Sequence, residues 1–175
     1  MRLILKALMC LCLLPAAALC QERISNVMVG PGNDLIRIVV SFIEEPSEQT
    51  YLLQTMIISL ERVKNRKEQP SGFFVDLTST VRNLSSGEKK QKILLLQWKK
   101  SGATELKCDG KWKKQDKADA AIEKIAEVTK SVIESVPLDA ETPTETKLPR
   151  EVEQKVLSVL NSLRTENLPC LRSVN

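Results

Sequence analysis

Histidine is absent from this 175-residue sequence, and aromatic residues make up only 3% of it. Without an imidazole the chain cannot use a Ser-His-Asp or Cys-His catalytic arrangement or a histidine-ligated zinc. The scarcity of rings leaves no series of aromatic side chains on which bases could stack, so no nucleic-acid partner is expected. The carboxylate pair Glu44-Glu45 lies beside Pro46 in polar sequence, where no apolar pocket would perturb its titration. We therefore expect a non-enzymatic protein with no cofactor and no metal site.

Long apolar runs are also missing, because no segment reaches the roughly 18 apolar residues of a membrane span. The shorter run Leu8–Leu14 follows two basic residues and precedes Pro15 and the sequence Ala18-Leu19-Cys20, which has the small-residue spacing that signal peptidase accepts. Residues 1–20 are predicted to be a signal peptide, cleaved after Cys20 or after Ala18. The protein is therefore predicted to be secreted.

Cysteine is scarce in the mature chain. Removal of residues 1–20 takes away three of the five cysteines and leaves Cys108 and Cys170, an even pair in an oxidising compartment. A disulfide between them would stabilise the fold by about 4 kcal/mol in the chain-entropy model. The same cleavage removes Arg2 and Lys6, so the net charge falls from +4 to +2. A net charge of this size does not indicate a class of binding partner.

Hydrophobic periodicity predicts both helices and strands. After an extended arm at residues 21–32, apolar side chains recur at the helical period over residues 35–43, which predicts a helix that ends at Pro46. Residues 47–68 fit a helix and a strand equally well. Alternation of apolar with polar side chains then predicts three strands separated by turns, at Phe73–Val81, Gln91–Trp98 and Thr104–Trp112.

The last third of the sequence has the period of amphipathic helices. One apolar face extends from Ile122 to Val136 before Pro137, and a second extends from Val152 to Leu163 after Pro149. Residues 138–149 are rich in Thr, Glu and Pro and contain few apolar side chains to bury, so they are predicted to be a linker.

Charge is distributed unevenly along the chain. Residues 88–117 contain ten lysines against four acidic residues, whereas residues 118–149 contain seven acidic residues against three lysines. The surface from Lys89 to Lys117 is a candidate for binding an anionic partner, either a glycosaminoglycan or a lipid surface. The alternative is a solvated strand edge whose lysines prevent pairing with other sheets.

The order of an arm with glycines, a helix and then hairpins resembles the cystatin family of secreted cysteine-protease inhibitors. The resemblance covers about residues 30–112 and rests on LERVKNRKEQPSGFFVDLTSTV at 60–81 and GEKKQKILLLQWKKSGATELKC at 87–108. It implies a helix packed across an antiparallel sheet. Three loops at one end of that sheet would form a wedge that occludes the cleft of a papain-like cysteine protease, competitively and reversibly.

The resemblance also implies which residues form this wedge. A tight glycine loop lets the backbone approach a partner, and an exposed indole is a rigid anchor for an apolar groove. The first loop is one residue shorter than the family pattern and lacks its valine, and a glutamine replaces the proline of the second loop. The protease-binding residues implied are Gly30, Gly32, Gln69, Pro70, Ser71, Gly72, Gln97 and Trp98.

Together these patterns predict an α+β fold with a cystatin-like domain at residues 21–117 and a helical C-terminal extension at residues 118–175. The alternative is an all-α bundle in which residues 90–100 form a helix that buries Trp98. Asn83 begins a glycosylation sequon in a turn between predicted strands, where it would either carry a glycan or close the turn.

Overall fold

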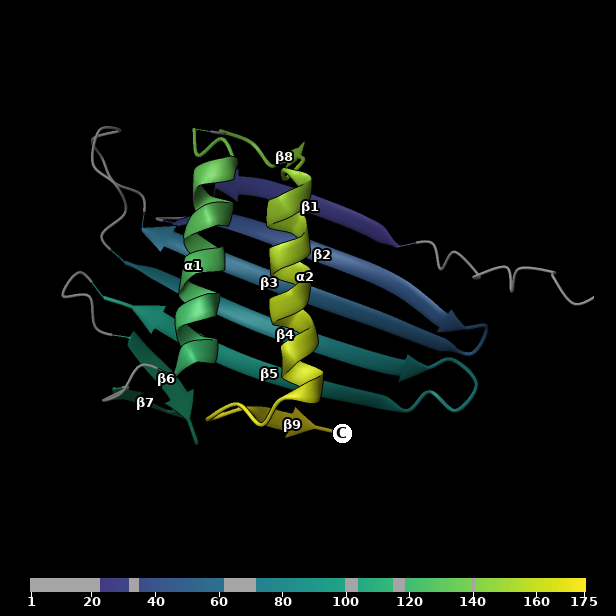
Figure 1. Ribbon diagram of the computed structural model, residues 1–175. Helices are drawn as coiled ribbons and strands as arrows, with labels where there is room; N and C mark the ends of the chain where they lie inside the picture. The colour runs from purple at the N-terminus through teal and green to yellow at the C-terminus, as the bar shows by residue number, and fades with distance from the viewer. Residues whose placement is uncertain (1–22, 32–34, 62–71, 100–103, 115–118, 140) are drawn as a thin grey trace, which may run out of the picture.

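The computed structural model of the protein describes residues 23–31, 35–61, 72–99, 104–114, 119–139 and 141–175. These residues form two layers, a nine-stranded sheet and a pair of helices that covers one of its faces (Figure 1). The predicted α+β class is confirmed, and the all-α alternative is wrong. The predicted signal peptide lies outside the described residues, as do four of the implied wedge residues: Gly32, Gln69, Pro70 and Ser71.

Seven strands follow one another as an antiparallel meander. They are β1 (Ile24–Pro31), β2 (Leu35–Ser47), β3 (Thr50–Glu61), β4 (Phe73–Asn83), β5 (Lys89–Trp98), β6 (Thr104–Cys108) and β7 (Lys111–Lys114). The chain continues with α1 (Ala120–Ser135), β8 (Thr144–Thr146), α2 (Arg150–Thr165) and β9 (Arg172–Val174). The spatial order is β7-β6-β5-β4-β3-β2-β1-β8, and β9 pairs with β5. The basic strand β7 is therefore an edge of the sheet.

The helix predicted over residues 35–43 is wrong, because this segment belongs to strand β2. Ile38, Val40 and Phe42 alternate toward the helices and are buried, while Val39 and Ile43 face the other side. With apolar side chains on both faces, positions three and four apart also match a helix. β-Branched residues favour the strand because their side chains pack well on a pleated surface.

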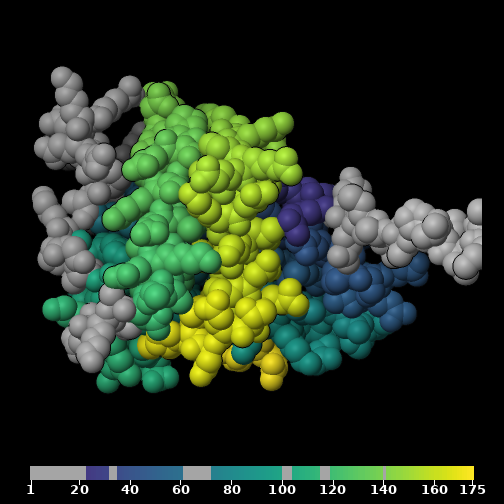
Figure 2. Space-filling model, viewed as in Figure 1, coloured from purple at the N-terminus to yellow at the C-terminus, as the bar shows by residue number. Residues whose placement is uncertain are grey.

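The two C-terminal helices form one layer over the sheet. The helices predicted before Pro137 and after Pro149 are confirmed as α1 and α2, which lie side by side over the strands (Figure 2). The Asp119 side chain caps α1 by accepting a hydrogen bond from the Ala121 N–H at 2.9 Å. We call the sheet face beneath these helices the covered face and the opposite one the open face. The buried apolar side chains that join the helices to the covered face include Ile58, Leu77, Leu94, Ile125, Val156 and Leu160.

Part of the predicted linker is structured. Within residues 138–149, β8 pairs antiparallel with β1 and extends the sheet beyond it. Leu138 and Leu148 pack against the hydrophobic core, so this connection between the helices buries more than its composition predicts.

The predicted disulfide is present between Cys108 and Cys170, whose Cα atoms lie 4.8 Å apart. Cys108 ends β6 and Cys170 shortly precedes β9, and both of these short strands pair with β5. The bridge therefore joins the two short strands that pair with the same edge of β5. It also connects the C-terminal segment to the sheet.

Candidate functional site

The hairpin formed by β6 and β7 contains the densest exposed basic sequence of the described chain, Lys-Trp-Lys-Lys at residues 111–114. A two-residue turn joins its strands, with φ of 52° at Asp109 and 80° at Gly110. Positive φ at both positions is the geometry of a type I′ turn, which matches the twist of the flanking strands. The prediction of one strand over Thr104–Trp112 is corrected to two, and the Asp-Gly dipeptide is the sequence signal of the turn.

Two exposed aromatic rings meet on the open face beside this hairpin. Phe74 of β4 is 44% exposed and Trp112 of β7 is 38% exposed. Their ring centroids lie 6.0 Å apart with an interplanar angle of 55°. The Lys107 ammonium lies 5.7 Å from the centroid of the Trp112 ring, within the range of a cation–π interaction. This cluster combines an apolar surface with positive charge.

A carboxylate anchors the base of the hairpin. Glu105 of β6 accepts hydrogen bonds from the Gln97 carboxamide and, at 2.8 Å, from the Lys99 ammonium. The Lys99 bond, followed by the Gln97 bond, holds the pKa of the Glu105 carboxyl below its ordinary value. Gln97, one of the implied wedge residues, is buried by this arrangement. Its side chain therefore positions Glu105 and lies away from the surface.

The predicted basic surface from Lys89 to Lys117 is divided by the fold. Lys90 forms an ion pair with Glu88 and Lys92 donates to Ser173, both near the start of β5. The hairpin pairs with Leu96–Trp98 toward the other end of that strand, and Leu96 lies four residues beyond Lys92, about 13 Å along the strand. Lys107, Lys111, Lys113 and Lys114 lie together on the hairpin strands, whereas Lys90 and Lys92 lie on β5.

Three hairpin lysines form no ion pair with any described residue. Within the hairpin, Lys113 is 3.9 Å from Asp109, and Glu105 is held by Lys99. The remaining cations are Lys107, Lys111 and Lys114. Lys114 faces Glu105 across the hairpin, and its charge adds to the effect of Lys99 and Gln97 in lowering the pKa of that carboxyl, so a polyanion at this edge would compete with Glu105 for Lys114.

The implied wedge residues that the structure describes lie toward one end of the sheet. Gly30 pairs with Arg37 near the end of β1, and Gly72 directly precedes β4. A Cβ at Gly72 would lie 2.7 Å from the Trp98 carbonyl oxygen, so this glycine allows close approach of the backbone to β5.

The Trp98 side chain does not project from this end of the sheet as an isolated anchor. It is partly buried on the covered face and packs against the Phe73 ring, with 4.8 Å between the centroids. The expectation of an exposed indole in the second loop is therefore not met. The exposed indole of the described chain is Trp112, which lies within the lysine-rich surface predicted from Lys89 to Lys117.

Asn83 closes the turn between β4 and β5. Its side-chain oxygen accepts hydrogen bonds from the Ser85 and Ser86 N–H groups, each at 2.9 Å. The Gly87 N–H donates to the Asn83 carbonyl oxygen at 2.9 Å. Asn83 thus has a structural role in a solvent-facing turn, and glycosylation there stays a prediction.

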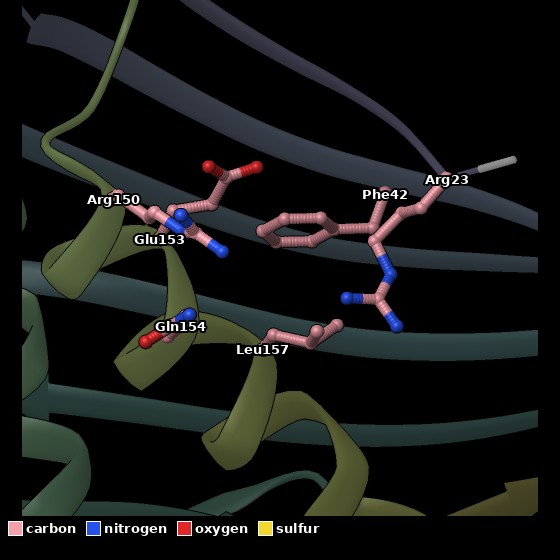
Figure 3. Close-up of a pocket in the computed structure, with 6 residues that line it drawn as sticks. All are labelled: Arg23, Phe42, Arg150, Glu153, Gln154 and Leu157. Carbon is pink, nitrogen blue, oxygen red and sulfur yellow. The ribbon is translucent and has the colours of Figure 1, made fainter. Parts of the chain in front are cut away.

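A hollow of about 180 Å³ lies between α2 and the β1–β2 side of the sheet. Arg150 and Glu153 lie on one side of it and Arg23 on the other, with the Phe42 ring between them (Figure 3). Small-molecule sites usually measure about 300–1,000 Å³. This hollow is below that size and carries charges of both signs, so it is a weaker candidate than the hairpin. Its lining residues are Arg23, Phe42, Arg150, Glu153, Gln154 and Leu157.

Neither helix of the described chain is long and apolar enough to cross a membrane. The chain matches no protein-family model, and no curated protein or solved structure is significantly similar to it.

Proposed function

We propose that the protein is a secreted, non-enzymatic binding module that engages an anionic partner through the β6–β7 hairpin. The observation that carries this proposal is the exposed edge strand β7, where the exposed Lys111 and Lys114 lie near Lys107. The bound groups would be closely spaced sulfates, phosphates or carboxylates on the partner.

The hairpin geometry supports simultaneous contacts with such a partner. Residues that face each other across an antiparallel pair have Cβ atoms about 5 Å apart, and alternate residues of one strand are about 7 Å apart. Lys107 pairs with Trp112, and Lys114 lies two residues farther along β7 on the same face. Lys107 and Lys114 therefore share the open face, whereas Lys111 pairs with the buried Cys108 and projects from the other side of the edge strand. Together the three ammonium groups surround this edge, and their joint effect exceeds that of one exposed ion pair.

Retention on immobilised heparin, a polyanion of high charge density, tests the proposal. The mature wild-type protein should remain bound above about 0.2 M salt, because several simultaneous contacts give a high affinity at low salt, from which binding stays measurable although it falls steeply with ionic strength. The triple variant Lys107→Gln, Lys111→Gln, Lys114→Gln should elute at clearly lower salt.

The matched control removes the same charge from the helix layer, by Lys124→Gln, Lys130→Gln and Lys155→Gln. All three lysines are exposed on α1 or α2. The control should elute close to the wild type. Equal losses in the two triple variants would show that net charge, and not the hairpin, governs retention, and would overturn the proposal.

A second function is proposed for the loop end of the sheet, namely reversible occlusion of a papain-like protease cleft by a cystatin-like wedge. The supporting observation is that Gly30, Gly72 and Trp98 lie toward the same end of the sheet. The helices follow the meander in sequence, whereas the resemblance implies a helix before the hairpins. The support for this function is therefore limited to the loop end.

Titration of the mature protein into papain or a lysosomal cathepsin tests the second function. Competitive loss of rate at micromolar protein is expected, and it should weaken in the Trp98→Ala variant if the indole or the loop that it supports contacts the protease. An unchanged rate at that concentration would refute inhibition and leave the hairpin proposal unaffected.

A further inference from the structure

One register row of the open face is largely apolar, and it lies between rows with mostly polar side chains. This row runs from Met28 through Val39, Ile57 and Asp76 to Leu95, so apolar side chains occupy four of its five positions. These four side chains are neither fully buried nor fully exposed. Both described helices lie on the covered face and leave this row without a helix above it (Figure 1).

The aromatic pair lies at the basic side of this face. Phe74 is in the register row next to the one that contains Asp76 and Leu95, and Trp112 contacts it from the hairpin. Lys107 and Lys114 flank Trp112 on the same face by strand alternation. Exposed aromatic rings, an aliphatic row and lysines are thus continuous on one side of the molecule.

We infer that the anionic partner of the hairpin is the surface of a phospholipid bilayer. The protein contacts this surface with the β7 side of its open face. This inference rests on the proposed function. A bilayer surface offers anionic headgroups to Lys107 and Lys114 and, a few ångströms deeper, an apolar boundary to Phe74 and Trp112. Aromatic side chains with a polar edge prefer this boundary.

A soluble sulfated polysaccharide matches only half of this surface. It would satisfy the lysines, but it has no hydrocarbon region to cover the Phe74 and Trp112 rings or the aliphatic row. The combination of exposed rings with cations therefore favours lipid over glycan. Because neither helix spans a membrane, the expected association is peripheral and reversible.

The fluorescence of Trp112 reports directly on the inferred contact. Trp98 and Trp112 are the two tryptophans of the chain, so Trp98→Phe leaves Trp112 as the single emitter. With vesicles of phosphatidylcholine mixed with phosphatidylserine, its emission should shift to the blue and become less accessible to a water-soluble quencher. Vesicles of phosphatidylcholine alone should produce a much smaller change. An unchanged emission with the anionic vesicles would overturn the inference.

Co-sedimentation of the wild-type chain with the same vesicles removes any dependence on the folding of the Trp98→Phe variant. Phe74→Ser keeps every lysine and should reduce the vesicle partition coefficient about tenfold. Lys114→Gln should reduce it about fivefold. Phe74→Ser should leave heparin retention unchanged, because heparin contacts only the charges. Equal partitioning of wild type and Phe74→Ser would overturn the role assigned to the aromatic pair.

The two proposals fail in different ways. Heparin retention that depends on the hairpin lysines, with no binding to anionic vesicles, overturns the lipid inference and keeps the proposed function. If neither heparin retention nor vesicle binding depends on the hairpin lysines, both the proposed function and the lipid inference are overturned. Vesicle binding that persists in the triple lysine variant overturns the electrostatic part of the account.

Discussion

The two faces of the sheet are built from the same strands and differ in what covers them. In β3, Ile58 points to the covered face and is fully buried under the helix layer, whereas its neighbour Ile57 points to the open face and stays partly exposed. The tryptophans repeat this contrast, since Trp98 packs against the core and Trp112 lies on the surface. The difference indicates that the covered face stabilises the fold and that the open face is available for binding.

The largest expected effect on stability concerns the Cys108–Cys170 disulfide. The double variant Cys108→Ser, Cys170→Ser opens a loop with a sequence separation of 62 residues. The free energy of unfolding should fall by about 4 kcal/mol, because the unfolded chain regains the entropy of that loop. Urea denaturation of the oxidised wild type and the double variant measures the difference. A loss below about 1 kcal/mol would show that the helices hold the C-terminal segment without the bridge.

Substitution of adjacent isoleucines compares the two faces directly. Ile58→Ala leaves a cavity in the packed core and should lower the free energy of unfolding by about 3 kcal/mol. Ile57→Ala removes the same atoms from the open face and should cost about 1 kcal/mol or less. Equal losses in urea denaturation would mean that the open face is also packed in the native protein, which would contradict the contrast between the faces.

A smaller effect is expected at the turn of the hairpin. Gly110 has φ of 80°, where a Cβ is strained although no atom lies within 4 Å of its position. Gly110→Ala should therefore lower the free energy of unfolding by about 1 kcal/mol through backbone conformation alone. Asp109→Asn is the control, because asparagine tolerates positive φ and should leave stability nearly unchanged. An unaffected Gly110→Ala variant would argue against the type I′ turn.

The smallest effect concerns the carboxylate beneath the hairpin. Because the folded-state pKa of the Glu105 carboxyl is lowered, chiefly by Lys99, its ionised form contributes stability above the unfolded pKa. This contribution should be lost as the pH falls through the folded pKa. The difference in unfolding free energy between wild type and Glu105→Gln should therefore shrink on acidification. A difference that grows in acid would reverse the sign and contradict the assigned contacts.

The sequence predicted the fold best where one face of an element is polar. The helices before Pro137 and after Pro149 could be recognised because their charged faces alternate with apolar ones at a single period. Periodicity failed over residues 35–43, because both faces of β2 carry apolar side chains there. The spacing of these side chains fits the period of a helix as well as that of a strand. Residues 47–68 were ambiguous for a similar reason, since Leu53 and Ile57 add apolar positions on the open face.

The candidate site was only partly accessible from the sequence. The surplus of lysines indicated the region of the proposed site, but it did not show that Lys89–Lys92 lie toward the start of β5 and that the hairpin pairs with Leu96–Trp98. The choice between the tryptophans required tertiary structure, because Phe74 and Trp112 come from strands far apart in the sequence. The Asp109-Gly110 turn was the one local signal that could have placed Trp112 on an exposed hairpin.

Amide hydrogen exchange of the mature chain, with and without heparin, tests most directly whether the β6–β7 hairpin is the binding surface. With heparin, we expect slower exchange in peptides that cover residues 104–114, while peptides from α1 and α2 exchange as in the free protein. Protection confined to the helix layer, or to the start of β5 around Lys89–Lys92, would contradict it.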